Sequence, residues 1–248
     1  MVRLFTTFYA EPRATRAREY ASCLERNLSC PSFDEICVLV ESGEESLPSS
    51  DKLRTRRVAR RPSYDDFFEW IGEIAAGDDT SVIANADIWF DPAIAVAAGA
   101  LGKRECFALA RWENDRLFDR NDSQDAWIVR GTMDDVNGDF PIGVPRCDNR
   151  LLHELEIAGY TVRNPAFSIR ANHVHSGQRS EYAVQPSAGW VPGPYRYLWP
   201  HNLWPLHKTV LHNATMPSQR IGWKVDWRRV SRTLPARAAK RILRAARP

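Results

Sequence analysis

Two polar residues, Asn85 and Asp87, lie inside an otherwise apolar stretch that runs from residue 81 to residue 91. Small and β-branched residues open the stretch and Ile-Trp-Phe closes it, so we predict a buried strand over residues 80–90. A carboxylate that is buried without a partner destabilises a fold by several kcal/mol. The chain must therefore fold so that a cation or a hydrogen-bond donor lies beside Asp87, unless the two polar residues only cap a turn.

The segments around this stretch alternate between predicted strands and predicted helices. This alternation favours an α/β fold with a mostly parallel central sheet, Rossmann-like, and helices on both of its faces. The basic residues 52–61 are interpreted mainly as a solvated connection. The further strands are predicted over residues 2–9, 36–40, 106–110, 125–129, 160–164 and 167–171, and the helices over 13–27, 64–76, 93–101 and 149–158.

The polar pair is expected at the carboxyl end of its strand. Asp91 precedes Pro92, and this order predicts a helix that starts at the proline with Asp91 as its N-cap. In open α/β sheets, ligands bind outside the carboxyl ends of the strands. The chain contains neither G-x-G-x-x-G nor G-x-x-x-x-G-K-[ST], so the dinucleotide and P-loop classes have no motif here.

The composition of the sequence changes near residue 186. We predict one domain over residues 1–185, followed over 186–248 by an irregular extension rich in Trp and Pro that ends in a basic tail. From Arg220 onward there are ten Lys or Arg and one Asp, a local charge of +9 within a net charge of +3. The tail is expected either to lie on an anionic membrane surface or to be a solvated terminus. No nucleic-acid motif accompanies it, so nucleic acid is not an expected partner.

Composition places the protein in the cytoplasm, with the inner face of the membrane as a peripheral location. No segment approaches the ~18 apolar residues of a membrane helix, and the N-terminal residues do not have the pattern of an export signal. The five cysteines are odd in number and lack C-x-x-C spacing, which predicts reduced thiols.

Five motifs occur in an order that resembles the nucleotide-sugar glycosyltransferases of GT-A fold. Asn85-Ala-Asp87 takes the place of that family's Asp-x-Asp, and the resemblance covers roughly residues 1–180. The first motif position departs from the family, because Asn85 replaces an aspartate, and this weakens the implied metal site. The other motifs are Ala-Leu-Ala-Arg-Trp at 108–112, Ser-Gln-Asp-Ala-Trp at 123–127, Gly-Val-Pro-Arg-Cys-Asp-Asn at 143–149, and the histidines His173 and His175.

The resemblance implies a donor site for a nucleoside-diphosphate sugar. Asp87, with His173 or His175, would hold a divalent cation, Mn²⁺ or Mg²⁺, that neutralises the departing diphosphate. An equal alternative for the two histidines is that they lie on a surface strand and bind no cation. An equal alternative for Arg16 is that it lies on an ordinary solvated face of its helix. The residues expected to bind the nucleotide sugar are Thr7, Tyr9, Arg16, Arg61, Tyr64, Asn85, Ala86 and Asp87.

The resemblance also implies an acceptor site, for a glycan or a lipid-linked hydroxyl compound, as in bacterial surface polysaccharide synthesis. We expect Asp125 to act as general base if the enzyme inverts configuration. Asp148 is its competitor, although its position before a helix also suits an N-cap. The residues expected to bind the acceptor are Arg111, Trp112, Trp127 and Asn149. Core packing is an equal alternative for the two tryptophans.

Two other functions remain open from the sequence. One is a non-catalytic protein that binds a glycan or a membrane surface through the Trp- and Pro-rich region and the basic tail. The other is a nucleotidyltransferase built on a related α/β sheet. Slow hydrolysis of a nucleotide sugar would distinguish a glycosyltransferase from both.

Overall fold

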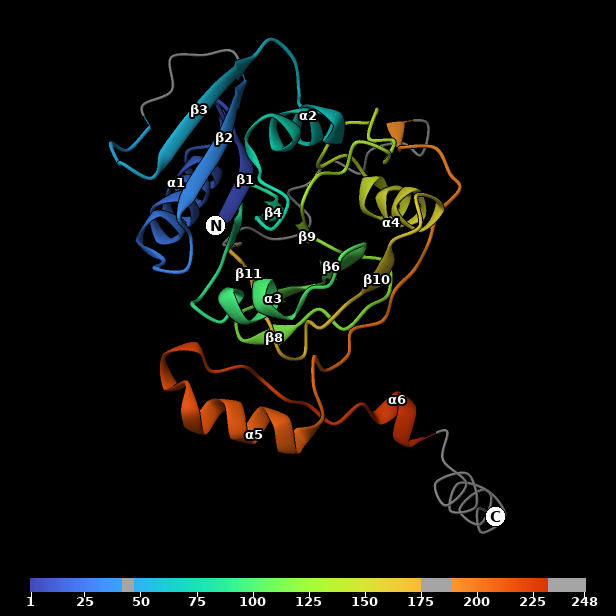
Figure 1. Cartoon of the computed structure of the whole chain (residues 1–248). Coiled ribbons are helices and arrows are strands. Elements are labelled where there is room, and N and C mark those ends of the chain that lie inside the picture. Colours follow the sequence, from blue (N-terminus) through green and yellow to red (C-terminus); the bar gives the residue numbers. More distant parts are fainter. Residues whose placement is uncertain (42–46, 175–188, 232–248) are drawn as a thin grey trace, which may run out of the picture.

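A seven-stranded sheet forms the centre of the protein in the computed structural model, which describes residues 1–41, 47–174 and 189–231 (Figure 1). The strand order is β10-β6-β9-β4-β1-β2-β3, and every neighbouring pair is parallel except the two pairs that involve β9. The strands are β1 (Val2–Phe8), β2 (Glu35–Glu41), β3 (Leu53–Val58), β4 (Thr80–Ala84), β6 (Glu105–Leu109), β9 (Ala126–Arg130) and β10 (Thr161–Arg163).

Helices cover both faces of this sheet, which confirms the predicted α/β fold. Because successive side chains of a strand point to opposite faces, β1 sends Leu4 into one core and Phe5 into the other. The first core also contains apolar side chains of α1 (Ala14–Ser29) and α3 (Ile94–Ala100). The second contains those of α2 (Tyr64–Ile74) and α4 (Cys147–Ile157).

The predicted strand over residues 80–90 is in fact two strands in two different sheets. β4 ends at Ala84, a turn follows, and β5 (Ile88–Trp89) belongs to a second sheet of order β5-β11-β7-β8. The other strands of that sheet are β7 (Arg111–Glu113), β8 (Arg116–Leu117) and β11 (Ala171–His173). Asn27 of α1 holds β5 in place, because its side chain donates to Ile88 O at 2.9 Å and accepts from Phe90 N at 3.0 Å. Asn85 and Asp87 therefore lie at the corner between the two sheets.

Three other local predictions were wrong. Residues 53–58 form the edge strand β3 rather than a loop, since their backbone pairs with β2 while their basic side chains point outward. Residues 167–170 are not a strand, and pairing begins only at Ala171 in β11. Helix α3 begins after Ala93 rather than at Pro92, although the Asp91 side chain does accept the Ala93 N–H at 2.9 Å.

The extension is less irregular than its composition suggests. It contains α5 (Leu206–Thr215), a short 3₁₀ turn η3 (Pro217–Gln219) and α6 (Trp227–Val230), and these lie along one end of the molecule (Figure 1). Within the described parts of the chain, no helix is long and apolar enough to cross a membrane. All five cysteines are buried free thiols. The basic tail from residue 232 onward lies outside the described residues.

Candidate functional site

A pocket of about 160 Å³ opens at the carboxyl ends of β1, β2 and β4. Strand β1 pairs with β2 on one side and with β4 on the other, so the chain reverses its direction of winding at β1. In open α/β sheets such a switch point leaves a crevice in which ligands bind. Seven of the eight residues expected to bind a nucleotide sugar line this pocket: Thr7, Tyr9, Arg16, Arg61, Asn85, Ala86 and Asp87.

Asp87 is buried in this first pocket and has the cationic partner that its burial requires. Its Oδ2 accepts from Arg16 Nη2 at 2.7 Å and lies 3.1 Å from His173 Nε2. Arg16 lies in the first turn of α1 and also contacts Glu19 at 2.5 Å, one helical turn further on. The turn-capping alternative for Asp87 is therefore wrong, because both contacts come from elements distant in sequence.

The charges around Asp87 determine how it titrates. Burial alone would raise the pKa of Asp87, but the hydrogen bond and charge of His173 and the guanidinium of Arg16 lower it to about 2. Burial likewise opposes the charge on His173, yet Asp87 raises the pKa of that imidazole above its ordinary value. An ionised Asp87 is thus held by the Arg16 guanidinium and by the His173 ring, whose protonated form it stabilises.

A second pocket, of about 330 Å³, adjoins the first. Asn85 and Gly143 line both pockets, so the two spaces meet at these residues. Gly143 has a φ of +72°, a backbone conformation that residues other than glycine rarely adopt. The second pocket is lined by both candidate catalytic carboxylates, Asp125 and Asp148, and by three of the four expected acceptor residues, Arg111, Trp127 and Asn149.

Asp125 is held in place by side chains on both of its oxygens. Asn85 Nδ2 donates to Oδ1 at 3.1 Å, and Arg111 Nη1 and Ser123 Oγ each lie 3.3 Å from Oδ2. The antiparallel pairing of β4 with β9 produces this arrangement, since it sets Ala84 opposite Ala126 and so brings the residues that flank them together. Asn85 therefore links the donor motif directly to the expected base.

Asp148 has different surroundings, and it is not the N-cap that its position suggested. The N-cap of α4 is Arg146, in a left-handed conformation with φ 75°, and Asp148 lies in the first turn. Its oxygens accept the backbone N–H of Gln124 at 3.2 Å and of Asn149 at 2.9 Å. Burial, together with the nearby charge of Asp125, raises the pKa of Asp148 to about 7. Two neighbouring carboxyl groups with unlike surroundings are the usual arrangement for acid–base chemistry.

Two of the expected ligand-binding aromatic residues belong to the core instead. Tyr64 is fully buried against Trp127 and Phe140, because α2 packs its apolar side onto the sheet, so Tyr64 does not reach the nucleotide pocket. Trp112 is buried too, and its indole N–H donates to Ala166 O at 2.8 Å, away from the acceptor pocket. Trp127 lines the second pocket but is 1% exposed, so it can offer a ligand very little surface.

The expected metal ligands are only partly assembled. Within residues 1–41, 47–174 and 189–231, no group of three or more His, Cys, Asp or Glu side chains is placed to hold a metal ion. Both ring nitrogens of His173 face other side chains, Nε2 toward Asp87 and Nδ1 toward Glu113 at 3.6 Å, so His173 is better placed to orient Asp87 than to bind a cation. His175 lies outside the described residues.

Oxygen atoms suited to Mg²⁺ do face the first pocket. In the described part of the chain, Oδ1 of Asp87 and Oδ1 of Asn85 accept no hydrogen bond, and both residues line this pocket. Mg²⁺ is often held by one or two protein oxygens together with phosphate oxygens and water. The two Oδ1 atoms therefore suit a cation that is also bound by a diphosphate. They are too few to hold a cation by protein ligands alone.

Sequence reasoning missed several residues that complete the two pockets. Tyr20 lines the first pocket, and its hydroxyl lies 2.5 Å from that of Tyr9. In the sequence, Tyr20 recurs with Leu24 and Leu28 at four-residue spacing, a pattern typical of the buried side of a helix. Glu113 joins the two halves of the site, because it accepts from Arg111 Nε at 2.6 Å and faces His173. Only the parallel register of β11 with β7, which sets His173 opposite Glu113, shows this link.

Comparisons with known proteins identified no relative of this chain. No protein-family model matches the chain, and no curated protein is similar enough in sequence to count as a match.

Proposed function

We propose that the protein is a glycosyltransferase that moves a sugar from a nucleoside-diphosphate sugar to a hydroxyl acceptor. The observation that carries the proposal is the pair of adjoining pockets that meet at Asn85 and Gly143. A transfer between two substrates needs two binding spaces whose reacting ends meet, with a proton acceptor on the acceptor side. The order of motifs that resembles GT-A enzymes supports the same assignment.

The first pocket has the chemistry for a nucleoside diphosphate. Arg61 supplies a guanidinium group, which can bind phosphate oxygens in a bidentate manner, and Thr7 and Tyr9 supply hydroxyl groups. The guanidinium of Arg16, which already donates to Asp87 and Glu19, adds positive charge to the pocket. Asp87 and Asn85 would hold a Mg²⁺ or Mn²⁺ ion through their free Oδ1 atoms. When bound, such an ion neutralises the charge that develops on the departing diphosphate.

The second pocket has the chemistry to deprotonate an attacking hydroxyl. Asp125 is positioned by Asn85 and Arg111, beside the border between the pockets. A well-oriented carboxylate at that point suits a general base in an inverting transfer. The pKa of Asp148 is about 7, so this carboxyl group exchanges its proton near neutral pH. Asp148 would then either take over the proton that Asp125 has accepted or remain neutral beside it.

A panel of nucleotide sugars tests the proposal. We expect the purified chain to hydrolyse at least one uridine- or guanosine-diphosphate sugar slowly in the presence of Mn²⁺ or Mg²⁺, and Arg61→Gln to weaken its binding. Arg54→Gln is the matched control, because Arg54 pairs with Glu35 on the far edge of the sheet. Absence of both binding and turnover with every donor would refute the proposal, whereas binding without turnover would favour a non-catalytic protein.

A further inference from the structure

Helix α5 packs against the protein with its polar residues. Thr209 is buried, and the His212 ring lies against Trp204 with 5.4 Å between the ring centroids. The Asn213 side chain both donates to and accepts from the backbone of Ile221, each at 2.9 Å. These three residues recur at helical spacing and make one polar stripe that faces inward.

The solvent-facing side of α5 carries three large apolar residues, together with His207 and Lys208. Leu206, Val210 and Leu211 are 50%, 59% and 66% exposed. A surface helix of a globular protein normally buries its apolar stripe and exposes its polar one. Helix α5 has the reverse orientation, and its contacts with Ile221 and Trp204 fix it in that orientation.

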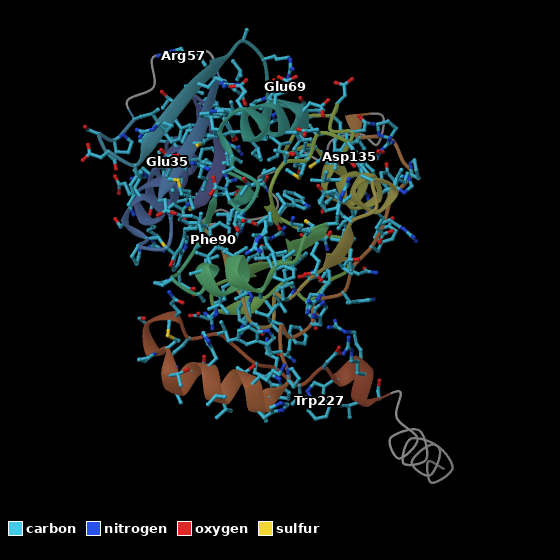
Figure 2. The ribbon with its side chains drawn as sticks, in the orientation of Figure 1. Glu35, Arg57, Glu69, Phe90, Asp135 and Trp227 are labelled. Carbon is cyan, nitrogen blue, oxygen red and sulfur yellow. The ribbon has the colours of Figure 1, made fainter. Side chains whose placement is uncertain are left out.

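Most of the exposed large apolar side chains of the described chain lie in the same C-terminal part of the sequence as this helix. Of the thirteen large hydrophobic residues that are exposed in the described chain, eleven lie between Trp190 and Val230. Trp227 is 72% exposed and lies at the same end of the molecule as α5 (Figure 2). We call the following set the C-terminal apolar surface: Leu206, Val210, Leu211, Met216, Trp223, Val225 and Trp227.

Basic residues accompany this apolar surface. Residues 189–231 contain six Lys or Arg and a single acidic residue, Asp226. Three of the six form ion pairs, Arg196 with Glu156, Arg228 with Asp119 and Arg229 with Asp226. The basic residues that remain to meet an anionic partner are Lys208, Arg220 and Lys224. Apolar side chains with Trp among them, bordered by Lys and Arg, are typical of helices that lie in the plane of a membrane surface. A second copy of the chain fits this surface less well, because a symmetric contact would bring the basic residues of both copies together.

We propose that the C-terminal apolar surface docks on an anionic lipid bilayer, with Leu206, Val210 and Leu211 of α5 inserted at the headgroup boundary. This proposal does not depend on the glycosyltransferase assignment, because it uses no residue of either pocket. It also does not depend on the tail beyond residue 231. Apolar insertion would supply the main affinity, and the basic residues would make binding selective for anionic headgroups.

Sedimentation of the full chain with vesicles tests the proposal. We expect binding to vesicles of phosphatidylcholine with phosphatidylglycerol, and much weaker binding to phosphatidylcholine alone. Val210→Glu with Leu211→Glu should lower the affinity by about tenfold or more for each side chain. Ile157→Glu is the matched control, since Ile157 is 68% exposed on α4, outside this surface, and the variant should bind like the wild type.

A second variant keeps the test decisive if the glutamate substitutions unfold the protein. Lys208→Glu with Arg220→Glu leaves the core intact, and it should weaken binding by roughly fivefold or more per residue, an effect that added salt should abolish. Wild-type affinity in both double variants would overturn the proposal. So would a stable dimer that binds no vesicles and dissociates in the Val210/Leu211 variant, because a second copy would then be the occupant.

Discussion

The sharpest prediction concerns Asp148 and the dependence of stability on pH. Asp148→Asn replaces a partly buried carboxyl group by a neutral group of the same shape. The pKa of Asp148 is raised to about 7, first by burial and then by the charge of Asp125, against an ordinary value of 3.8. We therefore expect the substitution to stabilise the protein above neutral pH, which is unusual for a residue inside a pocket.

The sign and size follow from proton binding in the two states. Between about pH 4 and pH 7 the unfolded chain loses the Asp148 proton while the folded chain keeps it, so the free energy of unfolding of the wild type falls as pH rises. The difference between a pKa of about 7 and one of 3.8 corresponds to at most about 4 kcal/mol. Weaker hydrogen bonds to the amides of Gln124 and Asn149 should subtract about 1 kcal/mol. The variant should hence gain little near pH 4 and about 3 kcal/mol near pH 8.

Urea unfolding of the wild type and the variant at several pH values measures this difference directly. Asp122→Asn is the matched control in the same pocket, because Arg120 lowers the pKa of Asp122 and its removal should destabilise the protein at high pH. The reasoning would be refuted if Asp148→Asn destabilised the protein equally at all pH values. That result would mean that Asp148 is ionised in the folded state.

Three further substitutions test the two pockets. Asp125→Asn should lower sugar transfer by about 10²–10⁴-fold with little change in donor affinity; normal transfer in this variant, with loss in Asp148→Asn, would show that the two roles are reversed. A nucleoside diphosphate with Mg²⁺ at 100 times its dissociation constant should add about 2.7 kcal/mol to wild-type stability, measured as a rise in melting temperature. Asp87→Asn should remove that rise, and an equal rise in both proteins would exclude Asp87 from the site. Arg16→Gln should destabilise the fold by about 3 kcal/mol in urea unfolding, because the buried Asp87 loses its guanidinium partner. Arg13→Gln, at an exposed position of the same helix region, should change little, and an equal effect of the two would argue against a buried pair.

The sequence by itself determined the fold class and most of the first pocket. Alternating strand and helix patterns require helices on both faces of a parallel sheet, and the polar residues after β1 and β4 then meet at one edge for any register. An isolated carboxylate in an apolar stretch also required a cation, and Arg16 meets that requirement. Local pattern is sufficient for such features, because they depend on periodicity and on the cost of burying charge.

Only the tertiary structure decided which partner each side chain has. Tyr64 and Trp112 looked like ligand-binding aromatic residues, but whether an aromatic side chain faces a pocket or a core depends on how its element packs. The break of the strand after Ala84, and the register that sets His173 beside Asp87 and Glu113, arise from pairing between residues 60 to 85 positions apart in the sequence. Helix α5 is a similar case, because contacts with Trp204 and Ile221 decide which of its faces meets the solvent. Periodicity gives a helix its two faces, but long-range contacts choose which one is buried.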